Sequence, residues 1–194
     1  MSGFGGSQVK SVAGKMRSNR GQQTAEFGAA IVILVTCIFV PMIDLAIVPV
    51  RYGLAQNIVA SYARKLGLSE KFSQAVAESQ SDDLKDQLLK LGGVRLKQID
   101  VQMVAASSKD EGAQTAADRP GGLGRDWLPD GSRCPCNYSL EVKVICGIEP
   151  LILLNIGGSA VTGLNAPFKT TLLGRSQWEN LGRNPASGEF YLNE

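Results

Sequence analysis

The chain has 194 residues, enough for one folded domain with appendages, and its 44% hydrophobic and 20% charged residues are ordinary for a globular protein. Four of its 20 basic residues precede position 22, so the remaining 16 would face 18 acidic ones and the formal charge of +2 would become about −2. A short basic tail without a basic, aromatic-studded face gives no support to nucleic-acid binding, and the lack of histidine excludes Ser-His and Cys-His nucleophile systems.

A basic leader, residues 1–21, contains glycine and serine but no acidic residue. The apolar run 27–50 follows, interrupted only by small residues, two prolines and Asp44. As a helix it would span roughly 36 Å, compared with about 30 Å for the hydrocarbon core of a bilayer. The run is too long for a cleaved secretory signal, whose apolar core has about 7–15 residues. We therefore expect residues 22–50 to be a transmembrane helix.

The topology of this span follows from its flanking charges. The positive-inside rule places the basic leader in the cytoplasm and the chain after Arg51 outside, which indicates a single-pass membrane protein. Membrane lipid is thus the first expected partner.

Residues 51–92 have a helical period. Leu54, Ile58, Tyr62 and Leu66 recur every four residues, which predicts that the helix continues with one apolar stripe and ends at Gly67. Two shorter amphipathic segments follow. The first has Leu68, Phe72 and Val76 on one face, and the second has Leu84, Leu88 and Leu91. The second is expected to open at Ser81 and to close at Gly92 and Gly93.

Residues 93–194 are expected to form a small β-rich domain, because two stretches within them have the alternating period of strands. The stretch VRLKQIDVQMVA, from position 94, alternates and then slips in phase between Leu96 and Ile99, which predicts either a bulge or a break within a strand pair. In YSLEVKVICGI the residues from Leu140 to Ile148 alternate cleanly, with Glu141 and Lys143 on the other face.

The remaining segments complete the expected domain. FKTTLL, from Phe168, is a further candidate strand, and residues 107–137 form a long loop that is either functional or mobile. The predicted fold class is α+β, with a long transmembrane helix that continues into an amphipathic helix, followed by a small antiparallel sheet of three or four strands.

Two carboxylates lie at the ends of the apolar run. Glu26 lies at its start, and Asp44 follows 18 residues later, roughly 27 Å along a helix. Asp44 is interpreted as an outer-interface residue. Glu26 has two interpretations: an interfacial group that the helix dipole favours, or a functional group, because carboxylates at membrane depth are costly.

The stretch RGQQTAEF, with the basic leader before it and the apolar run after it, resembles the processing site of type IV prepilins and pseudopilins. More specifically, AEFGAAIVIL, the following PMIDLAIVPVRYGLAQNIVASYARKLG and the late LEVKVICGIEPLILL resemble the TadE/TadG-like minor pilins of tight-adherence pili. The resemblance is close over residues 17–67 and looser beyond them.

The resemblance implies roles for three residues. In that family a membrane aspartyl peptidase cuts after the glycine, here Gly21, which would make Gln22 the new N-terminus. The family's glutamate at the fifth mature position guides assembly, and it corresponds to Glu26. The new α-amino group, with an ordinary pKa of about 7.7–8.0, would be largely protonated and could pair with Glu26 one helical turn away or with the glutamate of a neighbour. Implied partners are a prepilin peptidase, other pilin subunits and the pilus assembly machinery.

Three cysteines, Cys134, Cys136 and Cys146, lie beyond the span, where disulfides are allowed. A ring between Cys134 and Cys136 would be tight, so the sequence favours a bridge from one of them to Cys146, which would pin the long loop to a strand. A metal site is not expected, because Cys-x-Cys lacks a second pair and histidine is absent. No cofactor and no enzymatic activity are expected.

Two hypotheses follow. The first is a pilin-like minor subunit, cleaved after Gly21, that joins or primes a pilus or secretion-type filament used in surface attachment. The alternative is an uncleaved single-pass protein whose outer domain binds a ligand or partner through the 107–137 loop.

Overall fold

The computed structural model describes residues 19–151 and 166–194 of the chain. They fall into two units, the first ending at Met42 and the second running from Ile43 to Glu194. The predicted leader lies almost wholly outside the described residues.

The first unit contains α1 (Asn19–Leu34) and a π-helical turn, η1 (Val35–Phe39), after which α2 (Val40–Gly67) begins. The π turn is explained by Pro41, which lies two residues after it. Pro41 has no N–H to donate to the carbonyl of Cys37, so a regular ladder is interrupted here. In the same turn Thr36 Oγ1 donates to the carbonyl of Val32 at 2.7 Å. Pro49, the second proline of the apolar run, lies inside α2.

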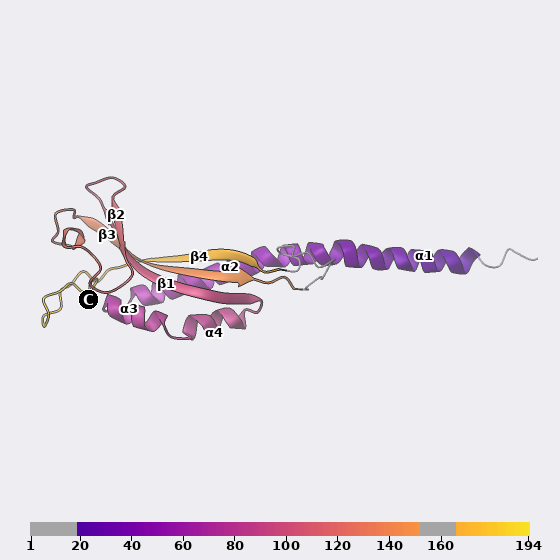
Figure 1. Cartoon of the computed structure of the whole chain (residues 1–194), viewed down its shortest axis with the longest axis horizontal. Helices are drawn as coiled ribbons and strands as arrows, with labels where there is room; N and C mark the ends of the chain where they lie inside the picture. Colours follow the sequence, from indigo (N-terminus) through magenta and orange to yellow (C-terminus); the bar gives the residue numbers. More distant parts are fainter. Residues whose placement is uncertain (1–18, 152–165) are drawn as a thin grey trace, which may run out of the picture. The chain divides into compact units, whose positions relative to one another are not determined.

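The second unit is built on a four-stranded antiparallel sheet (Figure 1). The strand order is β2-β1-β3-β4, and the strands are β1 (Val94–Ser107), β2 (Gln114–Ala117), β3 (Cys136–Ile148) and β4 (Phe168–Gln177). The register of β1 on β3 shifts between Leu96 and Gln98, which confirms the predicted bulge. The α+β prediction and the number of strands are also confirmed, and β4 is four residues longer than the FKTTLL stretch.

The second half of α2 covers one face of this sheet. Its buried residues are Ala55, Val59, Tyr62, Ala63 and Leu66, in addition to Asp44. The helix ends at Gly67 as predicted, but the predicted stripe was partly wrong, because Leu54 is 47% exposed. Val59 and Ala63, at the point where the helix backbone lies closest to β4, have shorter side chains than leucine.

Gly174 of β4 is the residue that allows this close approach. A Cβ atom built there would lie 2.5 Å from the carbonyl oxygen of Val59 and 2.9 Å from the Cβ atom of Ala63. Any side chain at position 174 would therefore collide with the α2 backbone. Glycine on the strand and alanine on the helix set the spacing between the two elements.

Two short helices, α3 (Phe72–Ser79) and α4 (Asp83–Lys90), lie alongside β1 (Figure 1). Leu84 and Leu88 are fully buried, as the predicted stripe requires, and Gly92 and Gly93 follow with φ angles of 72° and 67°. Three details differ. Leu68 is 83% exposed and precedes α3, Leu91 is only partly buried, and the residue that caps α4 is Asp82 instead of Ser81.

The predicted 107–137 loop is largely structured. It contains β2 and a 3-10 turn, η2 (Arg125–Trp127), and it buries Leu123, Leu128 and Cys134 against the core. Main-chain bonds close it, for example from Gly131 N to the carbonyl of Leu128 at 2.7 Å. The segment is therefore a packed part of the domain, and its length includes a strand, a 3-10 turn and residues of the core.

Candidate functional site

The first unit presents apolar side chains on its surface. Phe27 is 67% exposed, Val32 and Ile33 are each 61% exposed, and Phe39 is 51% exposed. By length and composition, the helical stretch Gln23–Gly67 is able to cross a membrane. Exposed large apolar side chains at this density are not stable in water, so they require a bilayer or protein partners.

The residues of the predicted processing site lie at the start of α1. Gly21 and Gln22 belong to the helix Asn19–Leu34, and Glu26 is an exposed residue one turn later. The structure thus supports the i, i+4 spacing between positions 22 and 26 on which the predicted pairing depends.

Asp44 lies in the second unit and is completely buried. Its Oδ1 accepts a hydrogen bond from the backbone N–H of Leu151 at 3.0 Å. The sequence interpretation as an outer-interface residue missed this contact. It joins positions 107 residues apart, so no local pattern could have indicated it.

Arg51 makes a second contact of the same kind. Its Nη1 donates to the carbonyl oxygen of Glu149 at 2.5 Å, and its guanidinium occupies the space that a side chain at Gly93 would need. Glu149 N in turn donates to the carbonyl of Gly93 at 2.7 Å. Asp44 and Arg51 therefore tie the start of α2 within this unit to the chain that leaves β3. This attachment fixes where the folded domain begins along the helix.

The three predicted disulfide candidates do not gather at one place. Cys136 and Cys146 both lie on β3, ten residues apart, which corresponds to roughly 33 Å along a strand. The favoured bridge from Cys134 or Cys136 to Cys146 was therefore wrong, because a straight strand separates the two ends. The thiol of Cys146 is buried, and this burial raises its pKa.

Cys134 and Cys136, by contrast, form a sulfur pair with their Sγ atoms 3.0 Å apart. The hydroxyl of Tyr138 lies 3.1 Å from Cys134 Sγ and donates to the carbonyl of Trp127 at 2.8 Å. Burial, and then Cys134, raise the pKa of Tyr138 well above its ordinary value. From the sequence a bridge within Cys-x-Cys was disfavoured because the ring would be tight, although the two thiols lie side by side.

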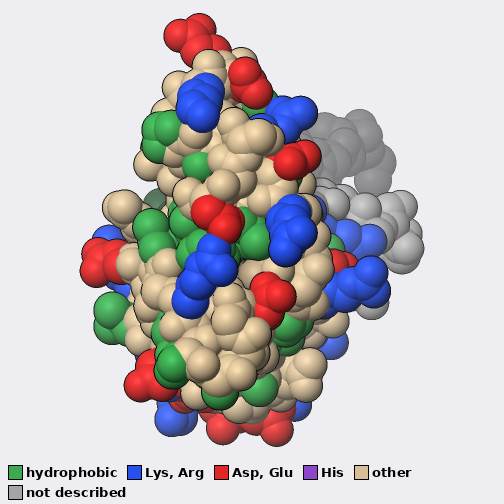
Figure 2. Space-filling view, turned by 90° about the vertical axis from the view of Figure 1, so that its left-hand side faces the viewer, with side chains coloured by type: hydrophobic (Ala, Val, Ile, Leu, Met, Phe, Trp, Pro, Cys, Tyr) green, Lys and Arg blue, Asp and Glu red, His purple; other side chains and the backbone are tan. Residues whose placement is uncertain are grey.

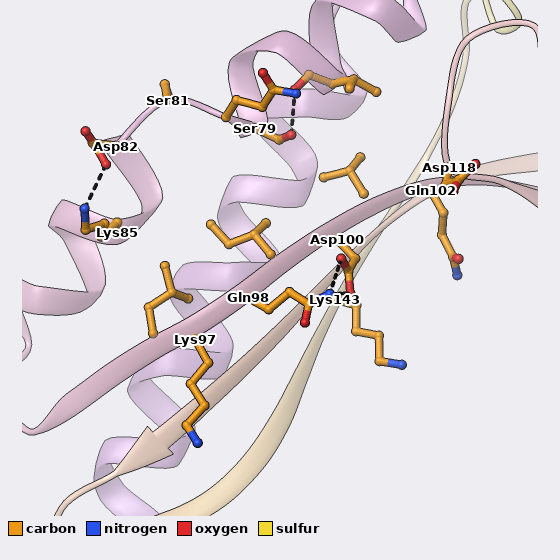
Figure 3. Close-up of a pocket in the computed structure, with 15 residues that line it drawn as sticks. Ser79, Ser81, Asp82, Lys85, Lys97, Gln98, Asp100, Gln102, Asp118 and Lys143 are labelled. Carbon is orange, nitrogen blue, oxygen red and sulfur yellow. Dashed lines mark hydrogen bonds and ion pairs between the residues drawn. The ribbon is translucent and has the colours of Figure 1, made fainter.

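A polar groove of about 730 Å³ lies between β1 and the α3–α4 connection (Figure 3). The groove runs along the part of β1 before Met103. This part of β1 does not pair with β2. Its charged lining residues are Asp82, Lys85, Lys97, Asp100, Asp118 and Lys143. The lining contains three acidic and three basic side chains, Lys85 pairs with Asp82, and Gln98 donates to Asp100. The groove therefore favours no single charge class of ligand.

The molecular surface outside the groove also has mixed charge. On the face drawn in Figure 2, Lys and Arg side chains are interspersed with Asp and Glu, and hydrophobic side chains gather only in small groups. Within the described parts of the chain, no group of three or more His, Cys, Asp or Glu side chains is arranged to hold a metal ion.

In comparisons with known proteins, no protein-family model, no curated protein and no solved structure matches this chain. The features that bear on function are therefore the N-terminal helix, the residues at its start and the domain attached to it.

Proposed function

We propose that this chain is a pilin-like minor subunit that is anchored in the bacterial cytoplasmic membrane, cleaved after Gly21 by a prepilin peptidase and assembled into, or used to prime, a pilus or secretion-type filament. The observation that carries the proposal is the exposed apolar surface of the N-terminal helix, which follows a glycine and a glutamate five positions apart. Such a helix suits two environments in succession, a bilayer and the apolar core of a filament.

The folded domain supports the proposal through its attachment. Because Asp44 and Arg51 are engaged by the domain, the apolar segment available to lipid or to sister subunits is mainly that before position 44. At about 1.5 Å per residue, residues 27–43 span roughly 25 Å, close to the thickness of a hydrocarbon core. The basic leader before it favours a cytoplasmic N-terminus and an extracytoplasmic domain.

Glu26 acts as an assembly group in this proposal. In an apolar environment its carboxylate stabilises the bound state only when a cation, such as a protonated α-amino group, lies beside it. A subunit without the carboxylate would leave that cation without its counter-charge. Glu26 is therefore a registration residue and takes no part in catalysis.

Processing is tested by the intact mass of the protein extracted from membranes of cells with an active prepilin peptidase. The expected mass lacks residues 1–21, and Gly21→Val is expected to restore the full mass because a branched side chain blocks the position before the cut. Gly14→Val, a matched change inside the leader, should leave the mass of the product unchanged. A wild-type chain that keeps its leader would instead support the uncleaved, ligand-binding alternative.

Assembly is tested separately by Glu26→Ala. Membrane insertion should be unchanged, because removing a carboxylate lowers the cost of insertion by about 2.5–3.5 kcal/mol at most. Incorporation into filaments should fall by an order of magnitude or more, since one uncompensated buried charge costs about 3–5 kcal/mol. Glu70→Ala, the same change on an exposed residue of the outer domain, is the control. Equal incorporation of both variants would contradict the assembly role and favour the interpretation of Glu26 as an interfacial group.

A further inference from the structure

The cysteine pair lies where the 118–135 segment, which connects β2 to β3, enters β3, and side-chain contacts of the neighbouring Arg133 hold this place. Ser107 Oγ donates to the carbonyl of Arg133 at 2.6 Å, and the guanidinium of Arg133 stacks over the ring of Trp127 at 4.9 Å. Cys134 is 9% exposed, whereas Cys136 is more open to solvent. The pair is therefore held in place by its surroundings, with one sulfur reachable from outside.

The backbone spacing permits a bond between the two sulfur atoms. Residues two apart can be separated by at most about 7 Å, and any bend brings their Cα atoms into the range of about 4.4–6.8 Å that disulfides use. The Sγ atoms already lie 3.0 Å apart, closer than two non-bonded sulfur atoms ordinarily rest. Little movement separates this arrangement from a covalent bond.

Loss of the two thiol hydrogens leaves no acceptor in need of a donor. Cys134 Sγ donates to the carbonyl of Leu128, but Gly131 N also donates to that oxygen at 2.7 Å. Cys136 Sγ lies 3.5 Å from the carbonyl of Arg133, which already accepts from Ser107. Oxidation therefore removes two weak donors whose acceptors keep a stronger partner.

The reduced pair is electrostatically unfavourable as a thiolate. Burial, and then the neighbouring Cys134, raise the pKa of Cys136 to about 11. At neutral pH the thiolate of the folded protein is thus scarce, and any exchange at Cys136 is slow. Reaction during folding, before the site is covered, is the faster route.

We propose that Cys134 and Cys136 form a disulfide in the mature protein, which closes a ring across Pro135 and fixes the base of the 118–135 segment, while Cys146 stays a thiol. The oxidant is a disulfide-carrying protein or small molecule. One cysteine thiolate attacks its S–S bond to give a mixed disulfide, and the second attacks the cysteine sulfur of that bond. Both oxidant sulfurs leave as thiols, so the oxidant gains the two electrons and two protons that the cysteines lose. Oxidation in the cell rests on the extracytoplasmic location proposed above.

The full chain provides its own test, because trypsin cuts after Arg133, Lys143 and Lys169. Peptide 134–143 contains both cysteines of the pair, and peptide 144–169 contains only Cys146. Cells are lysed in denaturant with an alkylating reagent, without reductant, and the membrane-extracted protein is digested. We expect peptide 134–143 to be unalkylated and lighter by two hydrogens, and to take up two alkyl groups after reduction. Peptide 144–169 should carry one alkyl group in both samples.

A second arm refolds the purified full-length protein with oxidised glutathione. The bond should form there as well, and faster as the pH rises from 7 towards 10. Two alkyl groups on peptide 134–143 in this arm would overturn the proposal, as would a disulfide that joins Cys136 to a second chain. A bond that forms with glutathione but is absent in cells would refute both the extracytoplasmic location and the disulfide of the mature protein. It would still agree with the short distance between the two sulfur atoms.

Discussion

At the scale of single residues, Gly174 most clearly controls the fold. Replacing it with alanine places a methyl group 2.5 Å from the carbonyl oxygen of Val59, and neither backbone is able to move without disturbing its own hydrogen bonds. We expect Gly174→Ala to lower the free energy of unfolding by about 1–3 kcal/mol, which is the usual cost of overpacking. Denaturant unfolding of the detergent-solubilised protein, followed by circular dichroism, measures this loss.

The control for this prediction is a glycine of α2, the helix that packs against β4. Gly53 lies in α2, and a Cβ atom there would meet nothing within 4 Å. Gly53→Ala should leave stability unchanged or raise it by up to about 1 kcal/mol, because alanine is the better helix former. If the two variants lost the same stability, the close approach of helix and strand would not be what requires glycine at position 174.

Glu141 illustrates at the same scale what the sequence could indicate and what it could not. Alternation placed its side chain on the face away from the core, and this orientation is confirmed. Its side chain is nevertheless only 9% exposed, because Arg175 and Gln102 from the two neighbouring strands both donate to it. Alternation defines the face of a residue, but the register of two other strands defines its burial.

At the scale of elements, α4 offers a direct comparison of buried and exposed leucines. Leu88 is fully buried, whereas its neighbour Leu89 is 53% exposed. Leu88→Ala should destabilise the domain by about 2–5 kcal/mol, because it removes core contacts and leaves a cavity next to β1. Leu89→Ala should change stability by no more than about 0.5 kcal/mol. Thermal unfolding of both variants checks the difference, and similar losses would mean that α4 does not pack as described.

Elements were predictable where one period extends through them. The bulge near Lys97 and the inward face of β3 followed from alternation alone, and the ends of α2 and α4 followed from glycines. The stripe on α2 was partly wrong for a tertiary reason. Gly174, more than a hundred residues away, brings β4 so close to α2 that the contact is made by Val59 and Ala63. The period of the larger apolar residues on the helix does not indicate this contact.

At the scale of the whole molecule, the contacts of Asp44 and Arg51 depend on how segments far apart in the sequence meet. The sequence located the apolar helix and the glutamate at its start, because both are local features. It did not indicate that Asp44 bonds to Leu151, or that Cys146 is at the far end of β3 from Cys136. Local patterns thus identified the candidate assembly segment, while the attachment of the domain to it required the fold.

Charged groups of the second unit predict how its stability depends on pH. Lys65 lies 2.7 Å from Glu78 and 3.0 Å from Asp83, and these contacts raise its pKa, while the same lysine and Gln87 lower the pKa of Asp83. A lowered carboxyl pKa stabilises the fold above the ordinary value of 3.8, and this contribution is lost as the pH falls. Lys71, with Asn184 and Ser187, lowers the pKa of Glu194 in the same direction from 4.5.

The alkaline side has the opposite sign. Lys65 and Tyr138 have raised pKa values, so their stabilising contributions are complete below the ordinary values of 10.5 and 10.0 and are lost as the pH rises beyond them. We therefore expect the unfolding temperature to be nearly constant between about pH 5 and 9 and to fall on both sides. Lys65→Gln should make both limbs shallower, because it removes the raised lysine and releases Asp83. Lys143→Gln, on an exposed lysine of β3, should leave both limbs as they are. The measurement is thermal unfolding from pH 3 to 11. If the two variants gave the same profile, the ion pairs of Lys65 with Glu78 and Asp83 would not be the cause of the pH dependence.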